Sequence, residues 1–518
     1  MNREGRQTRA ADAGAETRTG LTGNRGLQIE EKLIFEMDGL REGGIDMPEP
    51  EGLASPLDGL IEDSAPDLPG LSEPETMRHY VRLSQKNYAI DSGLYPLGSC
   101  TMKHNPRLNE KLARLPGFAD IHPLQPQSTV QGALELLHTL GGWLCAITGM
   151  PAVTLNPRAG AHGELAGMTA IRAAHEARGD VRKIVLAPES AHGTNPATAA
   201  LVGYKVRPVK ADADGTVRVE AVREMLGPDV AGIMVTNPNT CGLFERDLKA
   251  IADAVHEAGG YVYCDGANLN ALMGRADIAG LGVDAMHINL HKTFSTPHGG
   301  GGPGAGPVVF SEALEPFAPL PLLREQDGRY TLIEHEADAD GASPFGRMAA
   351  FHGQMGMFTR ALSFMLSHGG DGLQQATEDA VLNANYLRAG LSDVMSQPFG
   401  DRICMHEVLF DDRFLKGTDV STLDFAKAMI DEGFHPMTVY FPLVVHGAML
   451  IEPTESESKA SLDQFIAALG GLVRAAKAGE AERFHQAPIY APRRRLDETR
   501  AAREPVLVYR PAGQETEQ

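Results

Sequence analysis

The stretch VAGIMVTNPNTCGLFERDLKAIADAVHEAGGYVYCD, residues 230–265, predicts a strand, a helix and a second strand in succession. VAGIMVT and YVYCD are short apolar runs rich in β-branched and aromatic residues, as buried strands are. Between them, RDLKAIADAVHEAGG has helical spacing and ends on glycine, which favours a helix C-terminus. Strands that alternate with helices form a parallel sheet with helices on both faces. The stretch therefore predicts an α/β fold.

The same alternation continues on both sides. Further strand candidates are RKIVLA (182–187), DAMHINL (284–290) and GPVVF (306–310). Helical spacing recurs in GALELLHTLGGWLCAITGM (132–150), ELAGMTAIRAAHEARG (164–179) and a long stretch at 357–391. The last segment has β-runs of its own, TVYFPLVV (438–445) and AMLIEP (448–453). We predict an N-terminal extension and extended arm at 1–80, a large domain with a mainly parallel sheet at 81–365, and a smaller C-terminal α/β domain with a basic tail at 366–518.

Composition limits the classes of partner. At 518 residues the chain is too long for one compact core, and its net charge of −21 argues against nucleic acid or an anionic membrane as a main partner. No apolar run approaches the ~20 residues of a membrane span. The five cysteines lie far apart without a C-x-x-C pair, which predicts a reducing, cytoplasmic location. Residues 1–28 lack the apolar core of a secretory signal, so a disordered extension or a transit peptide remains.

Four loops carry unusual chemistry at predicted strand ends, where ligands bind in parallel α/β sheets. Asp265 ends YVYCD, Lys292 follows HINLH, His192 follows IVLAPESA, and the turn 160–162 opens a helix. Singly, each has an ordinary interpretation: a helix cap for the aspartate, a solvated lysine, a loop histidine and a simple glycine turn.

Together the four loops meet the needs of one cofactor, pyridoxal 5′-phosphate. The cofactor requires a lysine amine for its Schiff base and a carboxylate facing its pyridine nitrogen. Its dianionic phosphate suits the free N–H groups of a helix N-terminus, and His192 is a candidate to cover the ring. The combination predicts a pyridoxal-phosphate enzyme with a site built on Asp265 and Lys292.

The segment NLHKTFSTPHGGGGPGAGP (289–307) allows other interpretations. A Walker-type loop has its lysine after the glycines, whereas Lys292 precedes Gly299–Gly302, and no strand leads directly into this run as a dinucleotide fingerprint requires. His287, His291 and His298 lack the H-E-x-x-H pattern or a cysteine pair, so we predict no metal site.

Several long motifs resemble the glycine decarboxylase P-protein family of the glycine cleavage system. They are YPLGSCTMKHNP (95–106), DIHPLQPQSTVQG (120–132), AGAHGELAGM (159–168), ESAHGTNPATA (189–199), CDGANLNA (264–271), NLHKTFSTPHGGGGPG (289–304) and TVYFPLVVHGAMLIEPTESES (438–458). The chain has about half the length of the fused P-protein, and so resembles subunit 2, the beta subunit of the split bacterial form, which pairs with a separate subunit 1.

The resemblance implies a type I pyridoxal-phosphate-dependent transferase fold and a role for each matching residue. By motif, Lys292 is similar to the Schiff-base lysine, Asp265 to the pyridinium partner and His192 to the ring-stacking residue. Implied phosphate-turn residues are Gly160, Ala161 and His162; implied ring-hydroxyl contacts are Thr236 and Asn237; implied substrate-pocket residues are Ser99, Thr101 and His122.

The activity implied by this family is decarboxylation of glycine through a pyridoxal-phosphate aldimine, with transfer of the aminomethyl group to the lipoyl arm of H-protein. The implied assembly has two copies of each subunit. The glycine run then leaves room for the arm or only makes tight turns, and Cys100 is either a redox-sensitive thiol or a small buried hydrophobe. Rival hypotheses are another pyridoxal-phosphate lyase or transferase, and a non-catalytic scaffold subunit. The joint presence of Asp265, Lys292 and His192 argues against the scaffold.

Overall fold

The computed structural model describes residues 31–37, 60, 70–299 and 304–508. The chain divides into two compact units. Unit 1 comprises Met1–Ser92, Ile430–Gly433 and Glu482–Gln518, and unit 2 comprises Gly93–Met429 and Phe434–Ala481. The domain boundaries at 80/81 and 365/366 stay a prediction. Of the predicted N-terminal extension and arm, residues 1–30, 38–59 and 61–69 lie outside the described residues, as do the glycines at 300–302.

Unit 2 is built on a sheet that, within the described residues, has seven strands in the order β1-β7-β6-β5-β4-β2-β3. Strands β6, β5, β4, β2 and β3 pair in parallel, while β7 is antiparallel to both of its neighbours. The strands are β1 Ala152–Thr154, β2 Ile184–Pro188, β3 Lys205–Val209, β4 Val230–Thr236, β5 Tyr261–Gly266, β6 Ala285–Ile288 and β7 Val308–Phe310. The mainly parallel sheet predicted from the sequence is confirmed.

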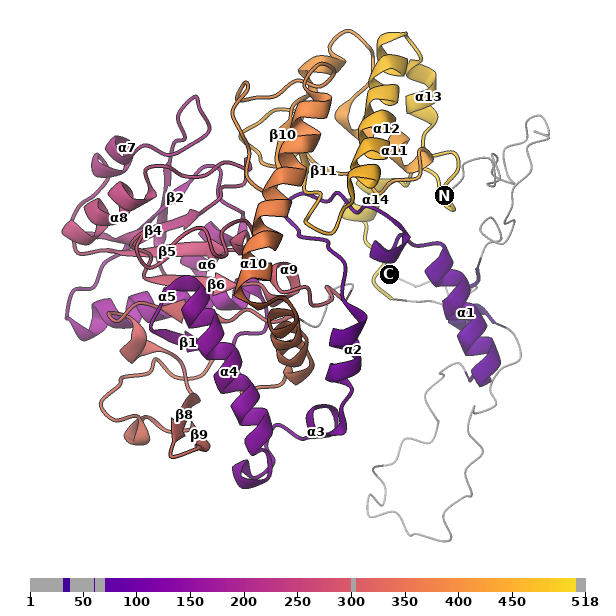
Figure 1. The fold of residues 1–518 in the computed structure, drawn as a ribbon. Helices are drawn as coiled ribbons and strands as arrows, with labels where there is room; N and C mark the ends of the chain where they lie inside the picture. Colours follow the sequence, from indigo (N-terminus) through magenta and orange to yellow (C-terminus); the bar gives the residue numbers. More distant parts are fainter. Residues whose placement is uncertain (1–30, 38–59, 61–69, 300–303, 509–518) are drawn as a thin grey trace. The chain divides into compact units, whose positions relative to one another are not determined.

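Helices cover both faces of this sheet (Figure 1). The main helices of unit 2 are α2 Arg107–Ala113, α3 Pro116–Ala119, α4 Gln131–Thr148, α5 Gly160–Ala177, α6 Thr194–Leu201, α7 Val219–Arg223, α8 Leu248–Glu257, α9 Leu290–Thr293, α10 Met355–Leu391 and α12 Lys459–Lys477; α11 Thr422–Asp431 and α13 Ala481–Gln486 run across the division between the units. Helices of 4 to 18 residues therefore follow strands β1 to β6, except that only a short 3-10 turn separates β5 from β6, broadly as the alternating sequence pattern predicts.

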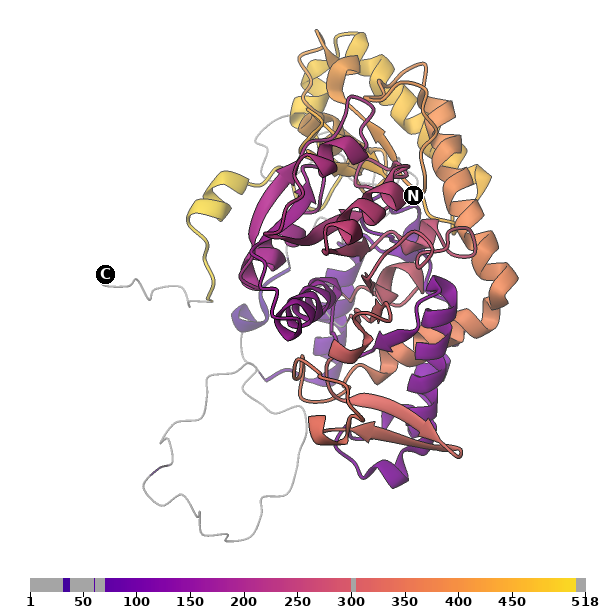
Figure 2. The same ribbon diagram turned by 90° about the vertical axis from the view of Figure 1, so that its left-hand side faces the viewer.

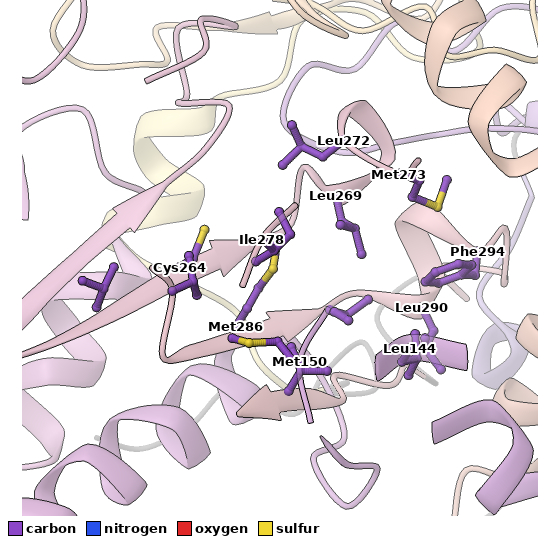
Figure 3. Close-up of a cluster of buried hydrophobic side chains, with 14 of the residues drawn as sticks. Leu144, Met150, Cys264, Leu269, Leu272, Met273, Ile278, Met286, Leu290 and Phe294 are labelled. Carbon is purple, nitrogen blue, oxygen red and sulfur yellow. The ribbon is translucent and has the colours of Figure 1, made fainter. Parts of the chain in front are cut away.

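Successive residues of each strand enter different cores because side chains alternate across a sheet. Cys264 belongs to the core under α4, α8 and α10, whose labelled members include Leu144, Met286 and Phe294 (Figure 3). Tyr263 belongs to the core under α5 and α6. A Cβ on Gly167 of α5 would lie 2.6 Å from the Tyr263 ring, so the glycine lets this helix lie directly on the sheet.

A smaller sheet and a long helix complete unit 2. The smaller sheet is antiparallel in the order β10-β12-β11, with β10 Val408–Phe410, β11 Thr438–Val439 and β12 Met449–Ile451. Helix α10 contacts α2 and α4 near one end, and β10 and α12 toward the other; Gly369 interrupts it with a φ of 65°. The hairpin of β8 Leu322–Gln326 and β9 Arg329–Ile333 packs on α4 (Figure 2).

One strand prediction was too long. Of TVYFPLVV, Thr438–Val439 form β11, and the chain then leaves the sheet. Tyr440 has a φ of 58°, and Pro442 lacks the N–H that a ladder needs.

Unit 1 contains α1 Glu73–Gln85 and α14 Glu498–Arg503. Within it, Glu31 accepts hydrogen bonds from Arg82 at 2.7 and 2.5 Å and lies 3.1 Å from His79 Nδ1. The Arg82 guanidinium lowers the pKa of Glu31 to about 2. In the part of the chain that is described, no helix has both the length and the apolar character that crossing a membrane demands.

Candidate active site

Most of the sequence-predicted site residues line one cavity of about 230 Å³ in unit 2. Those that line it are Ser99, Gly160, Ala161, His192, Thr236, Asp265 and Lys292. The strands β2, β4, β5 and β6 each end beside this cavity, as expected for a parallel sheet. The remaining lining residues are Glu164, Thr194, Thr240, Ala267, Asn268, His287, Asn289 and His291.

Asp265 is buried at the end of β5 with 4% of its surface exposed. Its Oδ1 accepts a hydrogen bond from the Ala267 N–H at 3.0 Å, and its Oδ2 accepts one from Asn195 Nδ2 at 3.1 Å. Burial acts to raise the pKa of Asp265, but His287 and these hydrogen bonds outweigh it, so the pKa lies below its usual value. Asp265 is therefore a buried, ionised carboxylate.

His287 is the neighbour that offsets the burial of Asp265. The two residues are partners in the register of β5 and β6, and His287 Nε2 lies 3.5 Å from Asp265 Oδ1. The Tyr263 hydroxyl lies 2.6 Å from the other ring nitrogen, Nδ1. A hydroxyl that donates to Nδ1 leaves the proton on Nε2, which directs an N–H toward the carboxylate.

Lys292 lies on α9, one short turn after β6. Its Nζ donates a hydrogen bond to the backbone carbonyl of Ser99 at 3.0 Å. Ser99 has a φ of 63°, a strained value for a residue other than glycine, and its N–H donates to Glu407 Oε2 at 2.8 Å. The loop before the large sheet is thus held in a conformation that presents a carbonyl oxygen to the lysine amine.

Gly160 and Ala161 are the first residues of the 18-residue helix α5, and both line the cavity. The first N–H groups of a helix have no partner within the helix and carry the positive end of its dipole. A Cβ on Gly160 would lie 2.6 Å from Asn289 Oδ1 and 3.2 Å from His287 Nε2. A side chain at residue 160 would therefore force the Asn289 amide to move.

His192 lies on the exposed side of the cavity, between β2 and α6. Its Nδ1 is 2.8 Å from Thr194 Oγ1 and accepts from the Thr194 N–H at 3.2 Å. Thr194 Oγ1 also donates to the buried Glu164 at 2.7 Å. The Phe441 ring lies edge-on to His192, with ring centroids 5.8 Å apart. The imidazole is thus oriented by neighbours on both sides.

Two further imidazoles near Lys292 are neutral at pH 7. Burial, with smaller contributions from His298 and Lys292, lowers the pKa of His291 to about 3. Burial likewise lowers the pKa of His298 to about 4. Cys100 Sγ lies 3.4 Å from His298 Nε2, and burial raises the pKa of that thiol. Cys100 is therefore a protonated thiol, which favours the small-hydrophobe interpretation over a reactive thiolate.

Four predicted residues do not line this cavity. His162 Nδ1 accepts a hydrogen bond from the Arg158 N–H at 3.2 Å, and Asn237 Oδ1 accepts one from the Glu245 N–H at 3.0 Å. Thr101 donates to Glu452 Oε1 at 2.6 Å. His122 lines a different cavity, of about 630 Å³, together with Phe118 and His352 among others.

Sequence reasoning missed other residues of the site. Glu164, in the second turn of α5, is buried with 3% exposure and was hidden inside an apolar helical pattern. His287 was weighed as a metal ligand and interpreted as a supporting or structural residue, without the specific contact with Asp265 that its position in β6 gives it. The parallel pairing of the two strands was the signal that would have found it.

The chain is similar to curated proteins over nearly all of its length. A protein of Caulobacter vibrioides named "Probable glycine dehydrogenase (decarboxylating) subunit 2" is 67% identical over 515 residues, covering 99% of this chain and 98% of the relative. A protein of the same name from Caldanaerobacter subterraneus is 48% identical and covers 92% of this chain and 98% of the relative. The chain belongs to the glycine dehydrogenase (decarboxylating) subunit 2 family.

Family and fold matches agree with this membership of the glycine dehydrogenase subunit 2 family. Residues 376–489 match the C-terminal domain of glycine dehydrogenase, and residues 163–319 match the aminotransferase class-V family. A crystal structure of glycine decarboxylase (P-protein) in inhibitor-bound form superposes with a TM-score of 0.66 at 20% identity, covering 80% of this chain and 92% of that one. The predicted family, type I fold and pyridoxal-phosphate dependence are confirmed.

Proposed function

We propose that this chain is the pyridoxal-phosphate-bearing subunit of a two-subunit enzyme that decarboxylates glycine. The observation that carries the proposal is that a buried, ionised Asp265 and the amine of Lys292 open into one cavity at the strand ends. Membership of the glycine dehydrogenase subunit 2 family indicates that the substrate is glycine.

The residues of the cavity fit this cofactor. Thr236 Oγ1, Asn289 Oδ1 and His291 Nδ1 are buried polar atoms without a hydrogen-bond partner in the protein, and all three residues line the cavity. Buried polar atoms are normally satisfied, so a polar ligand is expected here. The donor set combines an amine, a carboxylate and a helix N-terminus, which match the aldehyde, the pyridine nitrogen and the phosphate of pyridoxal phosphate in turn.

Each residue has a role that follows from its environment. Lys292 would hold the cofactor covalently, and the N–H groups of Gly160 and Ala161 would hold its phosphate. Asp265 would keep a proton on the pyridine nitrogen, because its low pKa leaves it negatively charged at neutral pH. His192 would cover the exposed face of the ring.

The bound cofactor supplies an electron sink for the bond between the Cα and the carboxylate of glycine. Burial keeps the imidazoles of His291 and His298 neutral, so neither adds a positive charge beside Lys292. The carbonyl of Ser99, a residue with a strained positive φ, accepts a hydrogen bond from Lys292 and so orients the amine.

The partners belong to the same proposal. We infer that the chain assembles with a subunit 1, two copies of each, in the cytoplasm, and that the aminomethyl group passes to the lipoyl arm of H-protein. The relatives' designation as subunit 2 and the glycine cleavage system of the structural neighbour support this inference.

Two of the predicted substrate-pocket residues have other positions. Thr101 would act through Glu452, to which it donates a hydrogen bond. His122 lines a separate cavity, which gives it no support as a pocket residue.

Isotope exchange tests the function. With subunit 1, lipoylated H-protein and pyridoxal phosphate, the purified chain should exchange labelled bicarbonate into the carboxyl of glycine. Other amino acids, offered as substrates in place of free glycine, should give no exchange. Absence of exchange with glycine, while borohydride still fixes a pyridoxyl group on Lys292, would refute the substrate and leave another pyridoxal-phosphate reaction.

A further inference from the structure

Two fully buried glutamates lie behind the loop that carries Ser99. Glu407 immediately precedes β10 and Glu452 immediately follows β12, and these strands are antiparallel with Val408 opposite Ile451. Continuing this register by one residue brings Glu407 opposite Glu452. Both glutamates have 0% of their surface exposed.

Each carboxyl uses one oxygen and leaves the other without a partner. Glu407 Oε2 accepts from the Ser99 N–H at 2.8 Å, and Glu452 Oε1 accepts from Thr101 Oγ1 at 2.6 Å and from Asn270 Nδ2 at 3.2 Å. Glu407 Oε1 and Glu452 Oε2 are buried without a hydrogen-bond partner in the protein.

The neighbouring histidine, His406, also has buried polar atoms without hydrogen-bond partners. Both ring nitrogens of His406 are buried and have no partner, and one of them lies within 4.8 Å of a carboxylate oxygen of each glutamate. An isolated, buried histidine with a low pKa is neutral and contributes no positive charge.

The charges around the pair do not neutralise two carboxylates. Among the described residues, neither glutamate forms an ion pair with a lysine or arginine. The charged groups that act on the pair are Lys292, whose Nζ bonds the Ser99 carbonyl, and Glu455, whose Oε1 is 2.6 Å from Lys103 Nζ. One nearby lysine can balance one negative charge, so a second buried carboxylate would be uncompensated.

We propose that Glu407 and Glu452 hold a single proton between their unpaired oxygens, and that this protonated pair positions the Ser99–Thr101 loop against Lys292. One oxygen of each carboxyl lies within 4.8 Å of one oxygen of the other. A single proton would turn the two unpaired oxygens into a donor and an acceptor, while the other oxygens stay bonded to Ser99 and Thr101. The importance of positioning Lys292 rests on the proposed function, because it assumes that Lys292 binds the cofactor. The shared proton does not depend on that assumption.

The electrostatics agree with this arrangement. Burial raises the pKa of both carboxyls, the charge of Glu452 raises that of Glu407 further, and Lys292 acts in the opposite direction on each. Neither glutamate lines the cavity, so both are positioning residues that act through the loop.

Infrared difference spectroscopy tests the proton directly. At pH 7.5 the full-length chain, purified with its partner subunit and free of cofactor, should show one more carboxylic-acid carbonyl stretch than Glu452→Gln shows. Burial raises the pKa of Glu245 to about 7, so a band from Glu245 would appear in both spectra and cancel in their difference. Glu257→Gln, at an exposed glutamate of α8, is the matched control and should leave the spectrum unchanged. Identical carbonyl bands in the wild type and Glu452→Gln would overturn the shared proton, as would one equivalent of bound metal ion in the wild-type chain.

Rescue by a conservative variant tests the positioning. In Glu452→Gln the amide oxygen can accept from Thr101 and Asn270 while its N–H donates to Glu407 Oε1, which reproduces the protonated pair. Glu452→Ala leaves Thr101 unpartnered and the Glu407 charge alone. We expect Glu452→Ala to weaken pyridoxal-phosphate binding by about tenfold or more, the factor that corresponds to about 1.4 kcal/mol, and Glu452→Gln to recover most of it. Equal affinities for Glu452→Gln and Glu452→Ala would overturn the positioning role, and the infrared result stands even if Glu452→Ala does not fold.

Discussion

Lys292 donates from Nζ to the backbone carbonyl of Ser99 across 193 residues of sequence, at 3.0 Å. The contact joins the end of β6 to the loop before the large sheet, and the left-handed φ of Ser99 aims the carbonyl. The reactive amine is therefore oriented by backbone, in a segment that precedes the cofactor-binding sheet.

Replacement of Lys292 should remove covalent attachment of the cofactor. In Lys292→Ala, borohydride reduction followed by mass spectrometry should find no pyridoxyl group, and the glycine-dependent bicarbonate exchange should fall to background. Lys249→Ala, at an exposed lysine of α8 paired with Asp253, is the control and should keep both. A pyridoxyl group on another lysine of Lys292→Ala would contradict the assignment.

Asp265 should matter for the reaction more than for binding. Asp265→Asn keeps the shape and the acceptor for the Ala267 N–H but removes the buried negative charge. Loss of one preorganised electrostatic partner costs roughly 10²–10³ in kcat, so we expect a loss of that order in the exchange rate. Cofactor content, measured by absorbance, should fall far less than activity. Asp253→Asn on the surface of α8 is the control, and a kcat within a few-fold of wild type for Asp265→Asn would reject the pyridinium role.

Gly160 should be intolerant of a side chain. The Cβ of Gly160→Ala would crowd Asn289 Oδ1 at 2.6 Å and narrow the helix end that is proposed to bind phosphate. We expect the Kd for pyridoxal phosphate to rise by about tenfold or more, a loss of about 1.4 kcal/mol. Gly132→Ala is the matched control, because a Cβ there meets nothing within 4 Å in α4 and alanine favours the helix. Equal affinities in the two variants would show that phosphate binding at the N-terminus of α5 does not depend on Gly160.

The sequence predicted the parts of the site that strand ends determine. Asp265 and Lys292 lie at the ends of apolar runs that the sequence identifies as neighbouring parallel strands. Their position at the same edge of the sheet was therefore predictable. The partnership of Asp265 with His287 required the register of β5 and β6. The Glu407–Glu452 pair required a second sheet whose strands are two or three residues long, too short for a periodicity to emerge. His122 was assigned by motif alone, and tertiary packing places it in another cavity.

His352 should make the protein less stable in mild acid. Burial, with a smaller contribution from Arg158, lowers the pKa of His352 to about 4, and its Nδ1 has no hydrogen-bond partner in the protein. In the unfolded chain its pKa is about 6.5, so between pH 6.5 and 4 the unfolded state binds the extra proton. The free energy of unfolding then falls as pH falls, by roughly 2 kcal/mol between pH 7 and 5 for this one residue.

The variant His352→Gln isolates this contribution because glutamine does not titrate. Unfolding by urea at pH 7 and at pH 5 should show a smaller loss of stability in the variant than in the wild type, by about that amount. Other buried histidines, such as His291 and His406, remain in both proteins, so their effects cancel in the difference. His138→Gln provides a control at a histidine whose ring lies 5.3 Å from Tyr330. If wild type and His352→Gln lost the same stability between the two pH values, His352 would be free to protonate in the folded state.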